Sequence, residues 1–89
     1  MENVTMRATT LADTAEMMNS PDYKERFKAE YHQVQIRYEK LLAMLMKREA
    51  GKLDFEPTCP IKILYAQASI MDEYLDILKE RARIEGVNL

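Results

Sequence analysis

Apolar residues recur along two long segments of the chain at alternating spacings of four and three. In the first segment they are Phe27, Tyr31, Val34, Tyr38, Leu41 and Leu45. In the second segment they are Ile61, Leu64, Ala68, Met71, Leu75, Leu78 and Ala82. This spacing places apolar side chains on one face of an α-helix and lets two such faces interlock. Because a short segment connects the two, we predict an all-α fold built on an antiparallel hairpin of two long helices.

Proline, glycine and capping residues mark where the predicted helices begin and end. A serine or threonine oxygen accepts a free backbone N–H, proline suits the first helical position, and glycine adopts the left-handed conformation that often ends a helix. The starts are marked by Ser20 before Pro21 and by Thr58 or Cys59 before Pro60, and the ends by Gly51 and Gly86. A short leading helix is indicated by Thr9 or Thr10 as its cap and by Leu11, Ala15 and Met18 on one face.

These signals predict a single helical-hairpin domain over residues 1–89, which is the size of one small domain. The domain consists of a leader with a short helix (1–19), helix one (20–51), a turn (52–59) and helix two (60–86).

The second helix carries more apolar surface than one partner helix can cover. Isoleucine recurs every seven residues, and Tyr74 lies on the same flank; the strip comprises Ile63, Ile70, Tyr74, Ile77 and Ile84. Small chains with an exposed apolar strip commonly gain stability by association. We therefore predict a homo-oligomer whose interface includes Ile63, Ile70, Tyr74 and Ile77. The alternative is a monomeric three-helix bundle in which the leader helix folds over the strip.

Composition and charge exclude several classes of function. The net charge is −2 with a sequence pI near 5.4, so a protein that coats DNA is not expected. No stretch of 18 consecutive apolar residues is present, so no membrane span is predicted. A single cysteine and an N-terminal segment unlike a secretory signal predict a cytoplasmic protein.

Basic residues prevail over residues 21–52 and acidic residues over 53–89. The simplest interpretation is ion pairing between the two helices or between protomers. The functional interpretation is a phosphate pocket at the start of helix one, where the helix dipole favours an anion and an aromatic ring lies beside cations. The residues of that cluster are Tyr23, Lys24, Arg26 and Lys28.

Catalytic and metal-binding patterns are missing from the sequence. His32 has no histidine or glutamate partner at helical ligand spacing, and Cys59 lacks the residues of a nucleophilic triad. Glycine-rich phosphate loops, G-x-S-x-G and C-x-x-C do not occur. We therefore expect no enzyme activity, no cofactor and no metal.

Two runs of residues resemble a family of small phage proteins. Asp22-Tyr-Lys-Glu-Arg-Phe-Lys-Ala-Glu30 has the form Y-x-x-R-hydrophobic-x-x-E, and Lys40-Leu41 follows in the same helix. Residues 64–81 match L-x-x-Q-x-x-x-M-x-x-Y-x-x-x-L-x-x-R. The family is named after a reading frame of crAss-like phages and is similar to the helical-hairpin sponges with which phages oppose CBASS and Thoeris immunity. The first nineteen residues match nothing in it.

The resemblance implies a phage anti-defence protein that acts in the cytosol of an infected bacterium. It would form an oligomer, a hexamer in the best-known sponges, whose inter-protomer pockets sequester a messenger without cleaving it. The messenger would be a cyclic oligonucleotide or a cyclic ADP-ribose-type molecule. By position, the resemblance assigns base stacking to Tyr23, phosphate binding to Arg26 and Lys40, and a second pocket or inter-chain ion pair to Arg81.

A different class of function would use the apolar strip itself. In this alternative the chain is a protein-interaction inhibitor or adaptor, and the strip docks on a host immune or replication protein.

Overall fold

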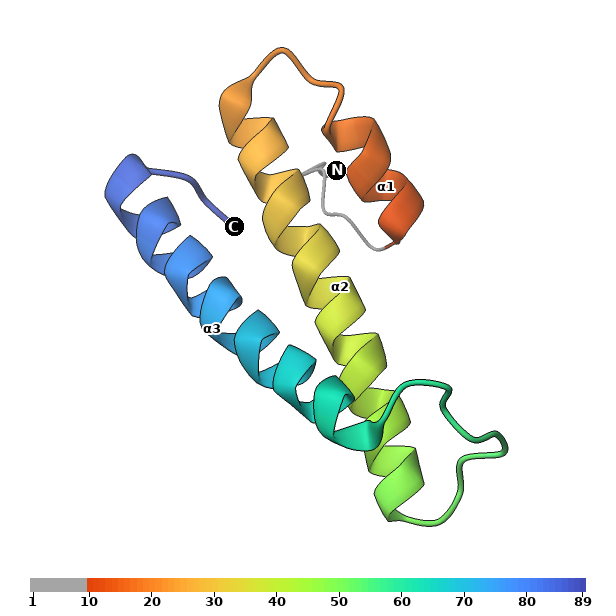
Figure 1. The fold of residues 1–89 in the computed structure, drawn as a ribbon. Helices are drawn as coiled ribbons and strands as arrows, with labels where there is room; N and C mark the ends of the chain where they lie inside the picture. The colour runs from red at the N-terminus through yellow and green to blue at the C-terminus, as the bar shows by residue number, and fades with distance from the viewer. Residues whose placement is uncertain (1–9) are drawn as a thin grey trace.

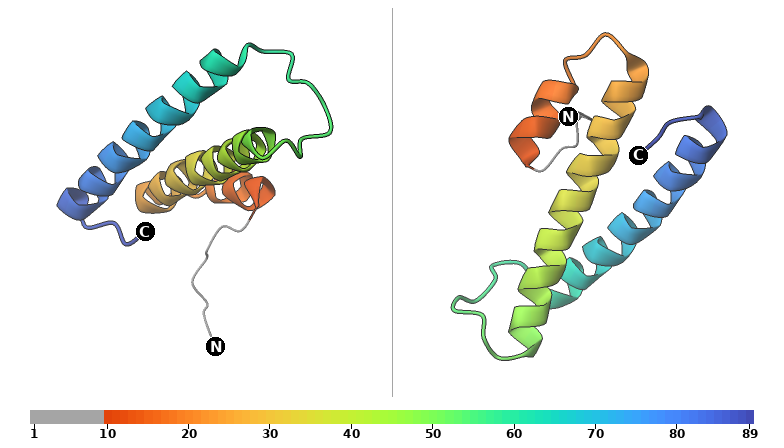
Figure 2. Two further views of the ribbon diagram at one scale, coloured as in Figure 1. Left: turned by 90° about the horizontal axis from the view of Figure 1, so that it is seen from below. Right: turned by 180° about the vertical axis from the view of Figure 1, so that it is seen from behind.

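The structure is a computed structural model that describes residues 10–89. These residues form three α-helices and no strand: α1 (Leu11–Met17), α2 (Tyr23–Glu49) and α3 (Ile61–Glu85). Helices α2 and α3 run antiparallel, and α1 lies against α2 on the side away from α3 (Figure 1 and Figure 2). The predicted all-α hairpin with a short N-terminal helix is confirmed. Its assembly into an oligomer stays a prediction.

The core follows the two predicted apolar faces. Phe27 and Tyr31 of α2 pack with Leu75, Leu78 and Ala82 of α3, and Val34 and Tyr38 lie against this cluster partly buried. The chain after α3 turns back towards α2 (Figure 1), so that Val87 joins the same cluster. Leu45 and Ala68 extend the buried seam towards the connecting loop. This cluster therefore lies towards the open end of the hairpin, where α2 begins and α3 ends.

Helix α2 begins later than the sequence predicted. Its N-cap is Asp22, whose side-chain oxygen accepts from the backbone N–H of Lys24 at 3.0 Å. The prediction of Ser20 as N-cap and Pro21 as first helical residue is wrong, because the Ser20 hydroxyl instead accepts from the backbone N–H of Asp22 at 3.1 Å. The helix ends at Glu49, and Gly51 follows with φ +71°.

Helix α3 has no side-chain cap at its start. Pro60 occupies the N-cap position with no side-chain hydrogen bond, so the prediction that Thr58 or Cys59 caps this helix is wrong. At the other end Gly86, with φ +70°, is the left-handed C-cap that the sequence predicted.

Helix α1 begins with a capping box between Thr10 and Asp13. Its buried side chains are Thr14 and Met17, whereas the predicted face of Leu11, Ala15 and Met18 is exposed. The predicted face is therefore wrong: α1 turns Thr14 inwards, and the Thr14 hydroxyl donates to the carbonyl of Leu11 at 2.7 Å.

The isoleucine strip stays exposed in the single chain. Ile63, Ile70, Ile77 and Ile84 each expose between 54% and 68% of their area. Helix α1 contacts α2 and not α3, so the three-helix bundle in which the leader helix covers the strip is not formed by residues 10–89. Gln67, which lies among these apolar residues, is exposed as well. Within 10–89, no helix is long and apolar enough to cross a membrane.

Candidate functional site

A pocket of about 280 Å³ opens at the end of the hairpin where α2 begins and α3 ends. It is lined by Met18, Tyr23, Arg26, Phe27, Glu30 and Arg81. Three of the four predicted ligand-binding residues, Tyr23, Arg26 and Arg81, therefore meet in one pocket. Arg81, which the resemblance assigned to a second pocket or an ion pair between chains, belongs to the same pocket as the other two. Lys40 lies outside it, about 21 Å along α2 from Arg26.

The helical repeat explains the α2 side of the pocket. Tyr23, Arg26, Phe27 and Glu30 follow one another at i, i+3, i+4 and i+7, which places them on one face of the helix. Phe27 is buried and fixed in the core, so it gives the pocket a rigid aromatic surface. The Arg81 guanidinium reaches across from α3 and lies 4.7 Å from the centre of the Phe27 ring. This cation–π contact holds a positive charge in the lining of the pocket.

Glu85 holds two of the pocket residues in place. The Nε of Arg81 donates to Glu85 Oε2 at 2.9 Å, and the hydroxyl of Tyr23 donates to Glu85 Oε1 at 3.2 Å. The hydrogen bond from Arg81, together with that from Tyr23, lowers the pKa of the Glu85 carboxyl below its ordinary value. Desolvation, followed by the hydrogen bond to Glu85, raises the pKa of Tyr23. One carboxylate thus positions a cation of α3 and an aromatic ring of α2.

The other charged residues of the pocket are also held. Arg26 donates from an Nη to the backbone carbonyl of Ser20 at 2.8 Å, which ties it to the segment between α1 and α2. Glu30 accepts a hydrogen bond from the Tyr74 hydroxyl, and this bond is the main cause of the raised pKa of Tyr74. Since a guanidinium carries five N–H donors, Arg26 and Arg81 keep donors for a ligand. Two cations and two aromatic rings equip the pocket for a ligand that combines negative charge with a ring.

The interaction between the two long helices differs from the charge pairing that the sequence predicted. Among residues 10–89, no lysine or arginine of one long helix forms an ion pair with a carboxylate of the other; the pairs Lys28–Glu25, Arg81–Glu85 and Arg83–Glu80 lie within single helices. Tyrosine hydroxyls instead donate to carboxylates across the hairpin. The four contacts are Tyr23–Glu85, Tyr74–Glu30, Tyr38–Asp72 and Tyr65–Glu49. Interhelical pairing in this chain is therefore tyrosine to carboxylate.

Glu85 was not among the predicted site residues, although the sequence contains a signal for it. Arg81 and Glu85 are separated by four residues, the spacing at which opposite charges pair along a helix. The bond from Tyr23 to Glu85 could not be read from the sequence, because it depends on how α2 and α3 are aligned.

The predicted interface residues lie on one face of α3 together with Arg81. Ile63, Ile70, Tyr74, Ile77 and Arg81 fall within an arc of about 60° when drawn at 3.6 residues per turn. Tyr74 connects the two features, because it is partly exposed within the strip and donates to Glu30 in the pocket. The pocket therefore borders the exposed apolar strip.

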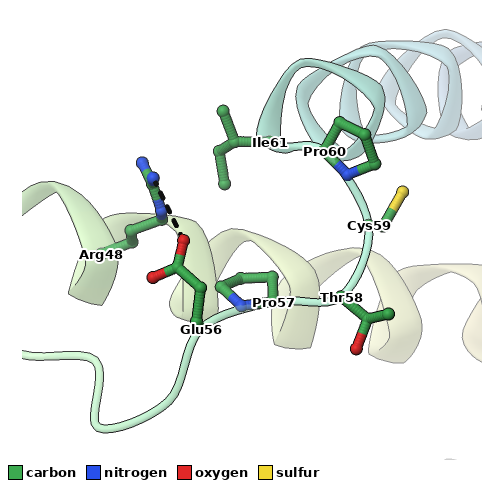
Figure 3. A pocket seen from close by; sticks show the side chains of 7 residues that line it. All are labelled: Arg48, Glu56, Pro57, Thr58, Cys59, Pro60 and Ile61. Atoms are coloured by element: carbon green, nitrogen blue, oxygen red, sulfur yellow. Dashed lines mark ion pairs between the residues drawn. The ribbon is translucent and has the colours of Figure 1, made fainter.

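A second pocket, of about 180 Å³, lies at the other end of the hairpin between α2, the connecting loop and the start of α3 (Figure 3). Its lining residues are Arg48, Glu56, Pro57, Thr58, Cys59, Pro60 and Ile61. Arg48, the one cation among them, faces Glu56 with an N–O distance of 3.9 Å. The pocket beside Arg81 is better equipped for an anion. Among residues 10–89, no group of three or more His, Cys, Asp and Glu side chains is placed to hold a metal ion.

The fold and the pocket together define a small helical-hairpin protein with a pocket lined by two arginines, two aromatic residues, a glutamate and a methionine. A family model described as Sequestin matches residues 21–84, and the chain belongs to the Sequestin family. No curated protein and no solved structure matches it. The family name indicates sequestration of a molecule and is consistent with the resemblance to sponges, whereas phage origin stays a prediction.

Proposed function

We propose that this chain is a phage anti-defence sponge. It sequesters a cyclic nucleotide messenger of the CBASS or Thoeris type, a cyclic oligonucleotide or a cyclic ADP-ribose-type molecule, in the cytosol of the infected bacterium. It binds the messenger without cleaving it, and the pockets lie between protomers of a homo-oligomer such as a hexamer. The observation that carries the proposal is the meeting of Tyr23, Arg26 and Arg81 in one pocket beside the exposed strip.

The chemistry of the pocket fits a cyclic nucleotide. Guanidinium groups form paired hydrogen bonds with phosphate oxygens, and Arg26 and Arg81 face the same space from different helices. Tyr23 exposes 46% of its area and its hydroxyl is fixed by Glu85, so its ring offers a surface on which a base can stack. Lys40 stays a predicted phosphate ligand that a neighbouring protomer would supply, since it lies too far away within its own chain.

The size of the pocket supports a site shared between protomers. Sites for small molecules usually measure about 300–1,000 Å³ and enclose most of the ligand. The pocket of one chain, at about 280 Å³, lies just below this range, and it borders the strip through the contact between Tyr74 and Glu30. A second chain packed on the strip would supply the missing wall.

The free energy gained by burying the strip is similar in size to the free-energy cost of association. Complete burial of an isoleucine side chain contributes about 1.5–3 kcal/mol. More than half of each of the four isoleucines is exposed, so covering them contributes about 3–7 kcal/mol per protomer. The loss of rigid-body freedom on association costs about 4–15 kcal/mol. A closed ring, in which every protomer makes two contacts, meets this cost better than an open pair.

Thermal shift measurements with cyclic di- and trinucleotides and cyclic ADP-ribose isomers test the proposal. A ligand at 100 times its Kd adds about 2.7 kcal/mol, and each kcal/mol moves the Tm of such a domain by roughly 4–8 °C. The expected shift is above about 10 °C. The bound compound is then released by denaturation and identified by mass spectrometry; we expect the intact messenger, and a hydrolysed product would contradict sequestration.

Matched variants exist for both ends of the hairpin. Tyr23 and Tyr65 are both exposed and both donate to a glutamate of the opposite helix, but only Tyr23 lines the pocket. We expect Tyr23→Ala to abolish retention and Tyr65→Ala to preserve it. Arg81→Met and Arg83→Met form a second pair, because both arginines are paired within α3 and only Arg81 lines the pocket. Equal loss in both members of a pair would argue against this pocket.

The alternative function is supported by the same exposed strip. If the chain is an interaction inhibitor or adaptor, it stays a monomer or dimer in isolation and forms a stable complex with a host protein. Light scattering separates the two: a mass of six chains together with bound messenger favours the sponge. A monomer that ignores every messenger and co-purifies with a host protein favours the adaptor.

A further inference from the structure

The pocket contains a carboxylate that an anion-binding site does not need. Glu30 lines the pocket with Arg26 and Arg81, and it is half-buried. Neither arginine forms an ion pair with it: Arg81 is paired with Glu85, and Arg26 donates to the carbonyl of Ser20. The hydrogen bond to Glu85 is the main cause of the raised pKa of Arg81, and the charge of Glu30 adds to it. A simple anion entering the pocket is therefore attracted by two cations and repelled by Glu30.

The orientation of this carboxylate is fixed. One oxygen, Oε2, accepts from the hydroxyl of Tyr74, and within residues 10–89 no side chain donates to Oε1, so Oε1 can accept from a molecule in the pocket that Glu30 lines. An ionised carboxylate has no proton to donate, so it only accepts hydrogen bonds. A ligand that places an N–H or O–H at this point gains a charge-assisted hydrogen bond, and a ligand that places an acceptor there is rejected.

We propose that Glu30 is the specificity-determining residue of the pocket and that it accepts a hydrogen bond from a donor located beside the ligand's phosphate. This inference rests on the proposed function. Among the bases, guanine fits best, since its N1–H and its amino group lie side by side as two donors. Uracil offers one N–H between two carbonyl acceptors. A ribose hydroxyl is the other source of a donor beside a phosphate.

The substitution Glu30→Gln gives a distinctive expected result. Tyr74 donates to one oxygen of Glu30, and in the variant the amide oxygen takes that place. The amide NH₂ group then faces the ligand, so the variant presents a donor where the native chain presents an acceptor. Glu49→Gln is the matched control, because Glu49 accepts from Tyr65 in the same way at the far end of the hairpin.

The experiment measures binding of cyclic di-GMP, cyclic di-UMP and their 2′-deoxy analogues by calorimetry. We expect the native chain to bind cyclic di-GMP at least about 10-fold more tightly than cyclic di-UMP, the range that one hydrogen bond to a charged group supplies. Glu30→Gln should weaken the guanine ligand about 10-fold and strengthen the uracil ligand, whereas Glu49→Gln should preserve the native ratio. If the donor is the ribose hydroxyl, Glu30→Gln weakens both ribonucleotides equally and has no effect on the 2′-deoxy analogues.

Two results would overturn the inference. If Glu30→Gln strengthens every ligand alike, Glu30 only repels anions; if it changes nothing, Glu30 does not contact the ligand. In both cases the native chain still binds and the proposed function stands. If the native chain binds no member of the messenger panel described above, the proposed function fails and this inference fails with it.

Discussion

Leu78 and Ile77 are neighbours on α3 with opposite environments. Leu78 exposes 1% of its area and packs in the core cluster, whereas Ile77 exposes 59% and belongs to the strip. Successive residues of a helix are rotated by about 100°, so these two side chains point towards different partners. Replacing each with alanine therefore tests both the alignment of the hairpin and the use of the strip.

The expected magnitudes differ several-fold. Truncating a buried leucine to alanine costs about 2–5 kcal/mol, because transfer and cavity terms add. That is a large share of the total stability of a domain with 89 residues, which at typical values is about 4–13 kcal/mol. Leu78→Ala should lower the Tm by roughly 8–40 °C. In a single chain, Ile77→Ala should cost less than about 1 kcal/mol, since most of the side chain is already in water and alanine favours the helix.

The two expected Tm changes are measured by circular dichroism during thermal unfolding. Each alanine variant is made in two backgrounds, the native chain and the variant Ile70→Asp. The aspartate places a charge in the middle of the strip at a position that exposes 65% of its area, so it should oppose association without disturbing the core. Leu78→Ala should cost the same in both backgrounds. Ile77→Ala should lower the Tm only in the native background, where assembly contributes to stability. Equal costs of Ile77→Ala in both backgrounds would refute the assignment of the strip to an interface.

Three further expectations concern helix ends and pH. Asp22→Ala should destabilise by about 1 kcal/mol and lower the Tm by roughly 4–8 °C, because α2 loses its N-cap bond. Gly86→Ala and Gly51→Ala should each cost about 1–2 kcal/mol in chemical denaturation, since both glycines have φ near +70° and the space around them is otherwise sufficient. The pKa of Glu85 is lowered in the folded chain, so its carboxylate stabilises the fold at pH values above its ordinary pKa of 4.5. This stabilisation is lost as the pH falls through the lowered pKa. Glu85→Gln should therefore reduce the fall in Tm at acid pH, which a series of Tm measurements against pH would show.

The hairpin could be predicted from the sequence because its signals are local and repeated. Each apolar face recurs over six or seven positions, and Leu45, Leu75 and Leu78 at these positions are indeed buried. The face of α1 could not be predicted, because a helix of seven residues gives too few repeats. A threonine also counts as polar in such a pattern, although Thr14 satisfies its hydroxyl on its own helix and is completely buried.

Only the part of the pocket that α2 supplies could be predicted from the sequence. Tyr23 and Arg26 share a face of α2, so their spacing indicated a common site. The place of Arg81 depends on the alignment of α3 against α2, which the tyrosine–carboxylate bonds help to set and which no short motif encodes. Lys40 was assigned by resemblance and not by spacing, and within one chain it remains far from the other three.

The same hydrogen bond between tyrosine and glutamate occurs at both ends of the hairpin with different surroundings. At the closed end, Tyr65 donates to Glu49 where the neighbouring cation, Arg48, faces Glu56. At the open end, Tyr23 and Arg81 converge on Glu85 above the buried ring of Phe27. The closed end needs only to hold two helices together. The open end holds two helices together with a cation and an aromatic ring facing a pocket, and it does so next to an apolar strip that one chain leaves exposed. The proposed ligand binding in this pocket therefore predicts that substitution of Glu85 lowers both the ligand affinity and the stability of the fold. Substitution of Glu49 should lower the stability alone.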